Sequence, residues 1–169
     1  NRYEFYLLYG GADSLQVSFF AHLGPWHTSE CGFSGSINAA GDVNNDGYDD
    51  MLIKYRRAED PPWDNRRGIF LGGTPPDTFP DFEICNIGLY YASKGKTCGN
   101  FNGLGGDDLV PYSSFDAGYL WYGDAWPLST DADIELESAG RLGEYQYGDL
   151  NGDGYDDICY GDPDYAAST

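Results

Sequence analysis

An acidic ten-residue segment that occurs three times is the feature that most constrains the fold of this chain. The three copies align without gaps and cover Gly41–Asp50, Gly99–Asp108 and Gly148–Asp157. The first copy is Gly-Asp-Val-Asn-Asn-Asp-Gly-Tyr-Asp-Asp, and the starts lie 58 and 49 residues apart. A short apolar stretch follows each copy at once, which predicts a tight acidic loop that leads into a strand.

A second repeat runs in phase with the acidic segments. It consists of aromatic and aliphatic residues that end in glycine, at Tyr6–Gly11, Ile69–Gly73 and Tyr119–Gly123. No window has sustained helical spacing, and 24 Gly and 9 Pro interrupt the chain of 169 residues. The sequence therefore predicts an all-β fold. A period near 50 residues is typical of β-propeller blades, so we expect about three units of four-stranded antiparallel sheet.

The phase of the repeats suggests where each unit begins. We place the units at approximately 12–73, 74–123 and 124–169, with further strands at 82–86, 134–137 and 145–147. Residues 1–11 then form a strand that completes another blade. Two explanations stay open: the chain is a segment of a longer propeller, or the 1–11 strand of one copy completes the last blade of a neighbouring copy by strand addition.

The acidic loops have oxygen donors at alternate positions, which is the arrangement that converges on one hard cation. Ca²⁺ fits better than Mg²⁺, because it accepts six to eight oxygens in variable geometry. A cation would also relieve the repulsion among carboxylates that crowd one loop. In the first loop the donors are Asp42, Asn44, Asp46, the backbone carbonyl of Tyr48, and Asp50. In the third loop they are Asp149, Asn151, Asp153, the backbone carbonyl of Tyr155, and Asp157.

The middle loop departs from this pattern. It offers Asn100, Asn102 and Asp108, but Leu104 occupies the position of the central Asp. We expect a calcium site there to be weak or empty. An EF-hand is excluded for the other two loops, because it needs a Glu at the twelfth loop position and flanking helices. The simpler alternative for all three loops is that Asp-Gly and Asn-Gly merely form good turns.

The segments GDVNNDGYDDMLI and GDLNGDGYDDICYG, with Gly32–Ile37 upstream of the first, resemble FG-GAP repeats. These repeats are the calcium-loop blades of integrin α-chain propellers and of many secreted proteins, including proteins with VCBS-type repeats. The resemblance implies two Ca²⁺ sites at the two full donor sets named above. It also implies that each loop links two strands within a blade. The middle repeat departs from the family at Leu104, and the Phe-Gly pair is eroded in the later repeats.

Charge and cysteine content bear on partners and location. The formal net charge of −19 argues against nucleic-acid binding, and no apolar run approaches the roughly 20 residues of a membrane span. None of the four cysteines forms a C-x-x-C pair, which argues against a zinc or redox centre. We therefore expect the oxidising environment of an extracellular or cell-surface location. We expect a Cys85–Cys98 disulfide, while Cys31 and Cys159 are either a second pair or two buried thiols.

Catalysis has little support in the sequence. His22 and His27 flank Gly24-Pro25-Trp26 in an expected loop, and Gly32–Gly35 is not a nucleophile elbow. The paired carboxylates are better explained as metal ligands than as glycosidase residues. We therefore predict that the chain is not an enzyme.

The expected role is structural, in adhesion or assembly, with a protein partner or a neighbouring copy. The alternatives are a glycan-binding module, with Trp63, Trp121 and Trp126 as stacking platforms, and the non-catalytic propeller of a larger secreted enzyme. For the aromatic residues the simpler interpretation is that they fill the space between blades. The irregular insertion 54–67 holds five of the nine basic residues, and it is either a solvated hairpin tip or a docking surface for an acidic partner.

Overall fold

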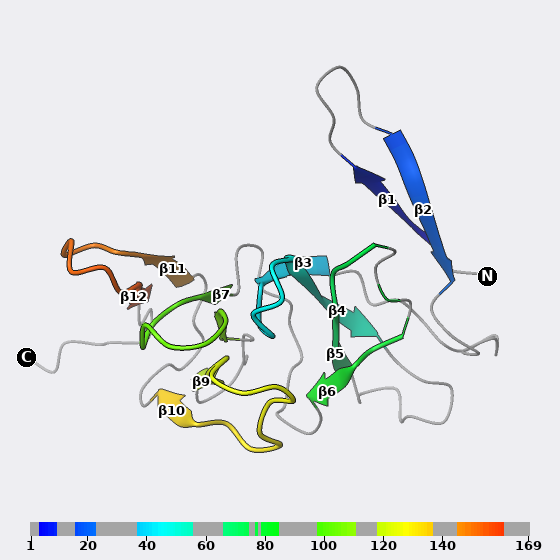
Figure 1. Ribbon diagram of the computed structural model, residues 1–169. Helices are drawn as coiled ribbons and strands as arrows, with labels where there is room; N and C mark the ends of the chain where they lie inside the picture. Colours follow the sequence, from blue (N-terminus) through cyan, green and yellow to red (C-terminus); the bar gives the residue numbers. More distant parts are fainter. Residues whose placement is uncertain are drawn as a thin grey trace, which may run out of the picture.

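The computed structural model describes residues 4–9, 16–22, 37–55, 66–74, 77, 79–84, 98–110, 118–136 and 145–160. These residues form strands and loops, and no helix occurs among them (Figure 1). All strand pairs are antiparallel, so the all-β prediction is confirmed. A hairpin of β1 (Glu4–Tyr9) and β2 (Gln16–His22) comes first in the chain. The sheets in the described ranges do not form a closed ring.

The first sheet is a four-stranded meander. It contains β3 (Ile37–Gly41), β4 (Asp50–Tyr55), β5 (Arg66–Phe70) and β6 (Phe82–Ile84), which pair in chain order. β4 and β5 are almost entirely buried, as expected for central strands that are covered on both faces.

The next four strands are shorter and form two two-stranded sheets that an isolated bridge links. β7 (Cys98–Gly99) pairs with β8 (Asp108–Leu109), and β9 (Gly118–Leu120) pairs with β10 (Ile134–Leu136). Two backbone hydrogen bonds between Leu109 and Trp121, of 2.8 and 2.9 Å, join β8 to the end of β9. A further sheet contains β11 (Tyr145–Gly148) and β12 (Asp157–Tyr160). We call the groups β3–β6, β7–β10 and β11–β12 units 1, 2 and 3.

The units follow one another in space as they do in sequence. The first strands of the three units are neighbours, with β7 in contact with both β3 and β11 (Figure 1). In every unit the acidic loop links the first strand to the second. The strands expected at 82–86, 134–137 and 145–147 are confirmed as β6, β10 and β11 within the described ranges, outside which residues 85, 86 and 137 lie. The boundaries drawn at 73–74 and 123–124 fall within units 1 and 2, before β6 and β10.

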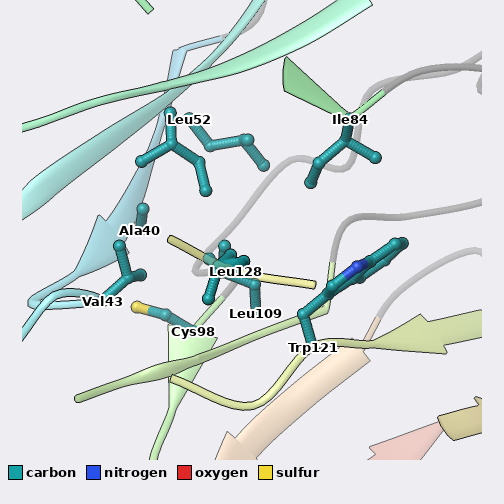
Figure 2. Close-up of a cluster of buried hydrophobic side chains, with 9 residues drawn as sticks. Ala40, Val43, Leu52, Ile84, Cys98, Leu109, Trp121 and Leu128 are labelled. Atoms are coloured by element: carbon teal, nitrogen blue, oxygen red, sulfur yellow. The ribbon is translucent and has the colours of Figure 1, made fainter. Parts of the chain in front are cut away.

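The hydrophobic core lies between successive units. Ala40, Val43 and Leu52 of unit 1 pack with Leu109 and Trp121 of unit 2 (Figure 2). A second cluster joins units 2 and 3; it consists of Val110 and Leu120 with Phe101, Leu136, Tyr122, Tyr147 and Ile158 packed against them. Each unit therefore buries apolar surface against the next one, as stacked repeats do.

The prediction of an irregular insertion over 54–67 is wrong at both ends. Lys54 continues β4 and Arg67 belongs to β5, because these two residues are paired across the strands and both are buried. Burial lowers the pKa of Arg67 to about 10, and burial with the charge of Arg67 lowers the pKa of Lys54. Arg66 forms an ion pair with Glu83 at 3.2 Å. Three of the five basic residues, Lys54, Arg66 and Arg67, thus belong to the sheet, while residues 56–65, which include Arg56 and Arg57, lie outside the described ranges.

Two further expectations involve residues outside the described ranges. Cys85 lies outside them, while Cys98 is buried in the core, so the Cys85–Cys98 disulfide stays a prediction. Trp63 also lies outside. Trp121 is 1% exposed, and Trp126 packs against Phe82 with ring centroids 6.3 Å apart. Trp121 thus lies in the core between units 1 and 2, as the simpler interpretation of the aromatic residues states, and Trp126 is half-buried and packs against that core. The described residues contain no helix long and apolar enough to cross a bilayer.

Candidate metal centre

The first acidic loop is closed by hydrogen bonds from its backbone to its own candidate ligands. The two carboxylate oxygens of Asp42 accept the N–H groups of Asp46 and Gly47 at 2.9 and 2.8 Å. Asn44 Oδ1 accepts the Asp46 N–H at 3.2 Å, and Asp46 Oδ1 accepts the Tyr48 N–H at 2.9 Å. Asn44 Nδ2 donates to Asp46 Oδ2 at 2.9 Å. The side chains of Asp42, Asn44 and Asp46, at the first, third and fifth positions of the loop 42–50, are thus held together at the exposed tip of the loop.

The third loop repeats this network bond for bond. Asp149 accepts the N–H groups of Asp153 and Gly154 at 3.0 and 2.9 Å, and Asn151 Oδ1 accepts the Asp153 N–H at 2.8 Å. Asn151 Nδ2 donates to Asp153 Oδ2 at 3.0 Å, and Asp153 Oδ1 accepts the Tyr155 N–H at 2.9 Å. Gly47 and Gly154 have φ values of 91° and 94°, a left-handed conformation that favours glycine at the sharp turn. The two loops are therefore the same structure at two places in the chain.

The last carboxylate of each outer loop, Asp50 or Asp157, belongs to the first residue of the strand that follows the loop and accepts backbone N–H groups. Asp50 is 1% exposed, and its two oxygens accept the N–H groups of Val43 and Gly72 at 3.0 and 2.7 Å. Asp157 accepts the N–H of Leu150, the residue equivalent to Val43, at 2.8 Å. Sequence reasoning assigned these residues as metal ligands and missed their part in closing the loop.

Burial raises the pKa of the Asp50 carboxyl to about 6. The hydrogen bonds from Gly72 and Val43 favour the ionised form and oppose this shift, whereas the charges of Asp46 and Asp42 add to it. The carboxylates of the loop are thus close enough to repel one another. A divalent cation at the tip would remove this repulsion.

Among the described residues, no group of three or more Asp, Glu, His or Cys is placed so that it could hold a metal ion. In loops 42–50 and 149–157 the convergent set at the tip has two carboxylates and one amide oxygen. Most of these oxygens accept one hydrogen bond and have a second lone pair; Asp149 Oδ1 is different, because it accepts the N–H groups of both Gly152 and Asp153. Oxygen donors of this kind suit a hard cation that tolerates irregular geometry, as Ca²⁺ does.

The middle loop keeps the backbone of the other two without the central carboxylate. Asn100 Oδ1 accepts the Gly103 N–H at 2.6 Å, and Asn102 Oδ1 accepts the Leu104 N–H at 2.8 Å. The Leu104 side chain is 59% exposed. Asn102 Nδ2 donates to Asp124 Oδ1 at 2.8 Å, a contact to a residue that sequence reasoning did not select. The loop fold therefore does not require an Asp at the fifth loop position, which Asp46 and Asp153 occupy in the other two loops.

Asp108 in the middle loop has the same structural role as Asp50. Its oxygens accept the N–H groups of Phe101 and Gly123, both at 2.8 Å, and the side chain is fully buried. Burial raises its pKa, and the charge of Asp124 adds to this effect. The hydrogen bonds of the last carboxylate are thus present even in the loop with the poorest donor set.

The doubled Asp at the end of each acidic segment has a second use that sequence reasoning missed. Asp107 N–H donates to the carbonyl of Asp42 at 2.8 Å, and Asp42 N–H donates to Asp107 Oδ2 at 3.0 Å. Asp156 and Asn100 make the same two bonds, of 2.9 and 3.0 Å, between units 2 and 3. The first Asp of the doublet thus joins its unit to the preceding one.

No protein-family model matches this chain, and no curated protein matches it either.

Proposed function

We propose that this chain is an extracellular, calcium-stabilised β-propeller segment with a structural role in adhesion or assembly and no catalysis of its own. In this proposal the three units are FG-GAP-like blades. Ca²⁺ binds the loops 42–50 and 149–157, and the 100–108 loop binds it weakly or not at all.

The observation that carries the proposal is the identity of the two loops. Both place the same donor types in the same hydrogen-bond network, and both link the first and second strands of a unit. Turn formation alone does not require this donor set, because the middle loop forms the same turn with Leu104 at the fifth position. The extra carboxylates in the outer loops therefore have a use beyond the turn, and cation binding is the use that their chemistry supports.

Calcium would act mainly on stability. The chain has a formal net charge of −19, so self-repulsion opposes its compact state. A cation that binds only the folded chain stabilises it by RT ln(1 + [L]/Kd), which is about 2.7 kcal/mol at a concentration of 100 Kd.

The test is isothermal titration with Ca²⁺ up to about 10 mM, since extracellular calcium modules have Kd values of about 0.1 to 1 mM. We expect two sites per chain and a melting temperature that falls when the metal is chelated. The double variant Asp46→Asn with Asp153→Asn should lose both effects. Asp131→Asn with Glu135→Gln, two exposed substitutions outside the loops, is the matched control, because it also removes two negative charges. Absence of binding over this range would refute the calcium part of the proposal.

Strand addition by residues 1–11 stays a proposal of its own. Residues 4–9 form β1 and pair with β2 of the same chain, so addition to a neighbouring copy would use the opposite edge of β1.

A further inference from the structure

Unit 3 exposes the same surface that units 1 and 2 each use to bind the unit after them. The contact between units is made twice within the chain, and three of its parts can be compared position by position. These parts are a hydrogen-bonded clamp, an apolar residue, and a glycine that is covered by a tyrosine. The first two parts occur in both contacts, whereas the third occurs only between units 2 and 3, because Asn45 and Gly106 occupy its positions between units 1 and 2.

The clamp is the reciprocal backbone and carboxylate pair of Asp107 with Asp42, and of Asp156 with Asn100. The glycine before each first loop residue leaves room for the carboxylate. A Cβ atom on Gly41 would overlap the Asp107 carboxylate, and one on Gly99 would lie 2.7 Å from Asp156 Oδ2. At Gly148, the equivalent position in unit 3, no described residue other than the chain neighbours lies within 4 Å of an added Cβ.

Burial follows the same pattern. The four residues that make the two internal clamps are half-buried; they are Asp42, Asn100, Asp107 and Asp156. Asp149, which is the first loop residue of unit 3, and Asp49, which is the first Asp of the doublet in unit 1, are both exposed. The described chain therefore contains one unused half of the clamp at each end of its series of units.

The apolar residue follows the first loop residue. Val43 is 0% exposed in the core between units 1 and 2. Phe101 is half-buried and packs against Tyr147 of unit 3, with ring centroids 5.6 Å apart. Leu150, at the same position in unit 3, is 71% exposed. Its exposure is the result expected for a surface that lacks the next unit.

The tyrosine contact completes the comparison. The Tyr155 ring of unit 3 lies over Gly103 of unit 2, where an added Cβ would overlap the ring. Gly152 is the equivalent of Gly103, with φ values of 81° and 73°, and in the described part of the chain only its own neighbours lie within 4 Å of its Cβ position. Tyr48 is the equivalent of Tyr155 in unit 1, and the two side chains are 51% and 47% exposed, so the difference between the units lies in the glycine rather than in the exposure of the tyrosine.

We propose that unit 3 binds unit 1 of a second copy of this chain, head to tail. The acceptor face consists of Gly148, Asp149, Leu150 and Gly152, and the donor face consists of Tyr48 and Asp49. The Tyr48-Asp49 pair of one copy occupies the place that Tyr155-Asp156 occupies on unit 2. A second copy is the favoured occupant because the chain itself carries both halves of the contact. Since the two faces differ, the contact is heterologous and gives a ring or a filament.

The inference rests on the assembly role in the proposed function, but not on calcium, because the clamp is formed by backbone and carboxylate groups alone. Both partners are acidic, so their long-range repulsion must be screened. The Debye length falls from about 30 Å at 0.01 M salt to about 8 Å at 0.15 M. We therefore expect stronger association at the higher salt concentration.

The experiment is sedimentation velocity of the full chain from about 1 µM to about 1 mM, a range that brackets weak self-association. The donor-face variant is Tyr48→Ala with Asp49→Ala, which keeps the Tyr48 carbonyl in the loop. The acceptor-face variant is Leu150→Ser with Gly152→Asn. Asn suits the backbone at that position, because Asn45 has a φ of 57° at the equivalent place in unit 1. Asp131→Asn is the control, and the thermal unfolding of every variant verifies that it folds.

We expect the wild-type chain and the control to form oligomers larger than dimers. Each face variant alone should weaken association at least about tenfold, the effect of losing a central contact. An equimolar mixture of the two variants should form dimers and stop there, because each retains one working face. A monomeric wild-type chain, or variants that associate like the wild type, would overturn the proposal. So would a mixture that fails to dimerise. Association that persists with chelator while titration detects no calcium would refute only the calcium sites.

Discussion

Asp107 and Asp42 hold units 1 and 2 together through two hydrogen bonds that run in opposite directions between the same two residues. The Asp107 N–H donates to the Asp42 carbonyl at 2.8 Å, and the Asp107 carboxylate accepts the Asp42 N–H at 3.0 Å. One residue thus satisfies both backbone groups at the start of the neighbouring loop. The equivalent pair between units 2 and 3 has the same geometry.

The first prediction concerns the carboxylate of this clamp. Asp107→Ala leaves the half-buried N–H of Asp42 without its acceptor, so we expect a loss of about 1 to 3 kcal/mol in the free energy of unfolding. Asp49→Ala is the matched control, because Asp49 occupies the same motif position and is exposed. Urea unfolding at a protein concentration too low for association measures both. Equal losses for the two variants would contradict the structural role of Asp107.

The second prediction uses two glycines with nearly the same backbone conformation. Gly103 and Gly152 have φ values of 73° and 81°, but only Gly103 lies against a ring, that of Tyr155. An Ala at either site meets the cost of a left-handed conformation, about 1 to 2 kcal/mol. Gly103→Ala must also displace Tyr155, so we expect it to be the more destabilising substitution by at least about 1 kcal/mol. Thermal unfolding of dilute samples compares them, and equal stabilities would show that Tyr155 yields without cost.

Much of the fold could be predicted from the sequence because local turn chemistry and spacing specify it. The acidic segments contain their own hydrogen-bond acceptors two to five residues from the donors that they satisfy, so the loop conformation depends on nearby residues alone. The glycine-ended and apolar stretches mark the strands for the same reason. The antiparallel all-β arrangement follows from short strands separated by turns.

The contacts between units could not be predicted, because each joins two residues that are far apart in the sequence. The separation is 65 positions for Asp107 and Asp42 and 56 positions for Asp156 and Asn100. Asp107 and Asp156 resemble any other acidic loop residue in the sequence, and only the structure shows that they bind Asp42 and Asn100. Arg67 shows a different error, in which a buried strand residue was assigned to an irregular insertion. A cluster of basic residues suggests a solvated surface, yet pairing with Lys54 across the central strands buries both side chains.

The third prediction restores the missing carboxylate of the middle loop. Leu104→Asp places a carboxylate at a position where the backbone N–H already bonds to Asn102 Oδ1, as the Asp153 N–H bonds to Asn151. Because the loop geometry is in place, we expect a third calcium site in titrations. Leu104→Asn is the control, since it adds an oxygen donor without the charge. A variant that still binds two ions would indicate that Asn100 at the first position also limits binding.

The last prediction concerns pH and the buried carboxyl of Asp50. Its pKa is raised from 3.8 to about 6, chiefly by burial, so the folded chain binds this proton more tightly than the unfolded chain. The contribution of Asp50 to the free energy of unfolding is therefore largest below about pH 4, and it falls as the pH rises through about 6. In the presence of chelator, so that no metal competes with the proton, we expect the free energy of unfolding to decrease over this interval.

Asp50→Asn isolates this contribution, because an amide does not titrate in the interval while it keeps one acceptor for the N–H groups of Val43 and Gly72. At pH 4, where protonated Asp50 stabilises the fold, the variant should have a lower free energy of unfolding than the wild type. The difference between these two free energies should become smaller toward pH 7. Asp131→Asn, at an exposed site, should show the wild-type slope. Urea unfolding at several pH values measures the difference. A gap that stays constant from pH 4 to pH 7 would mean that Asp50 titrates alike in the folded and unfolded chains, and that the two backbone hydrogen bonds fully offset its burial.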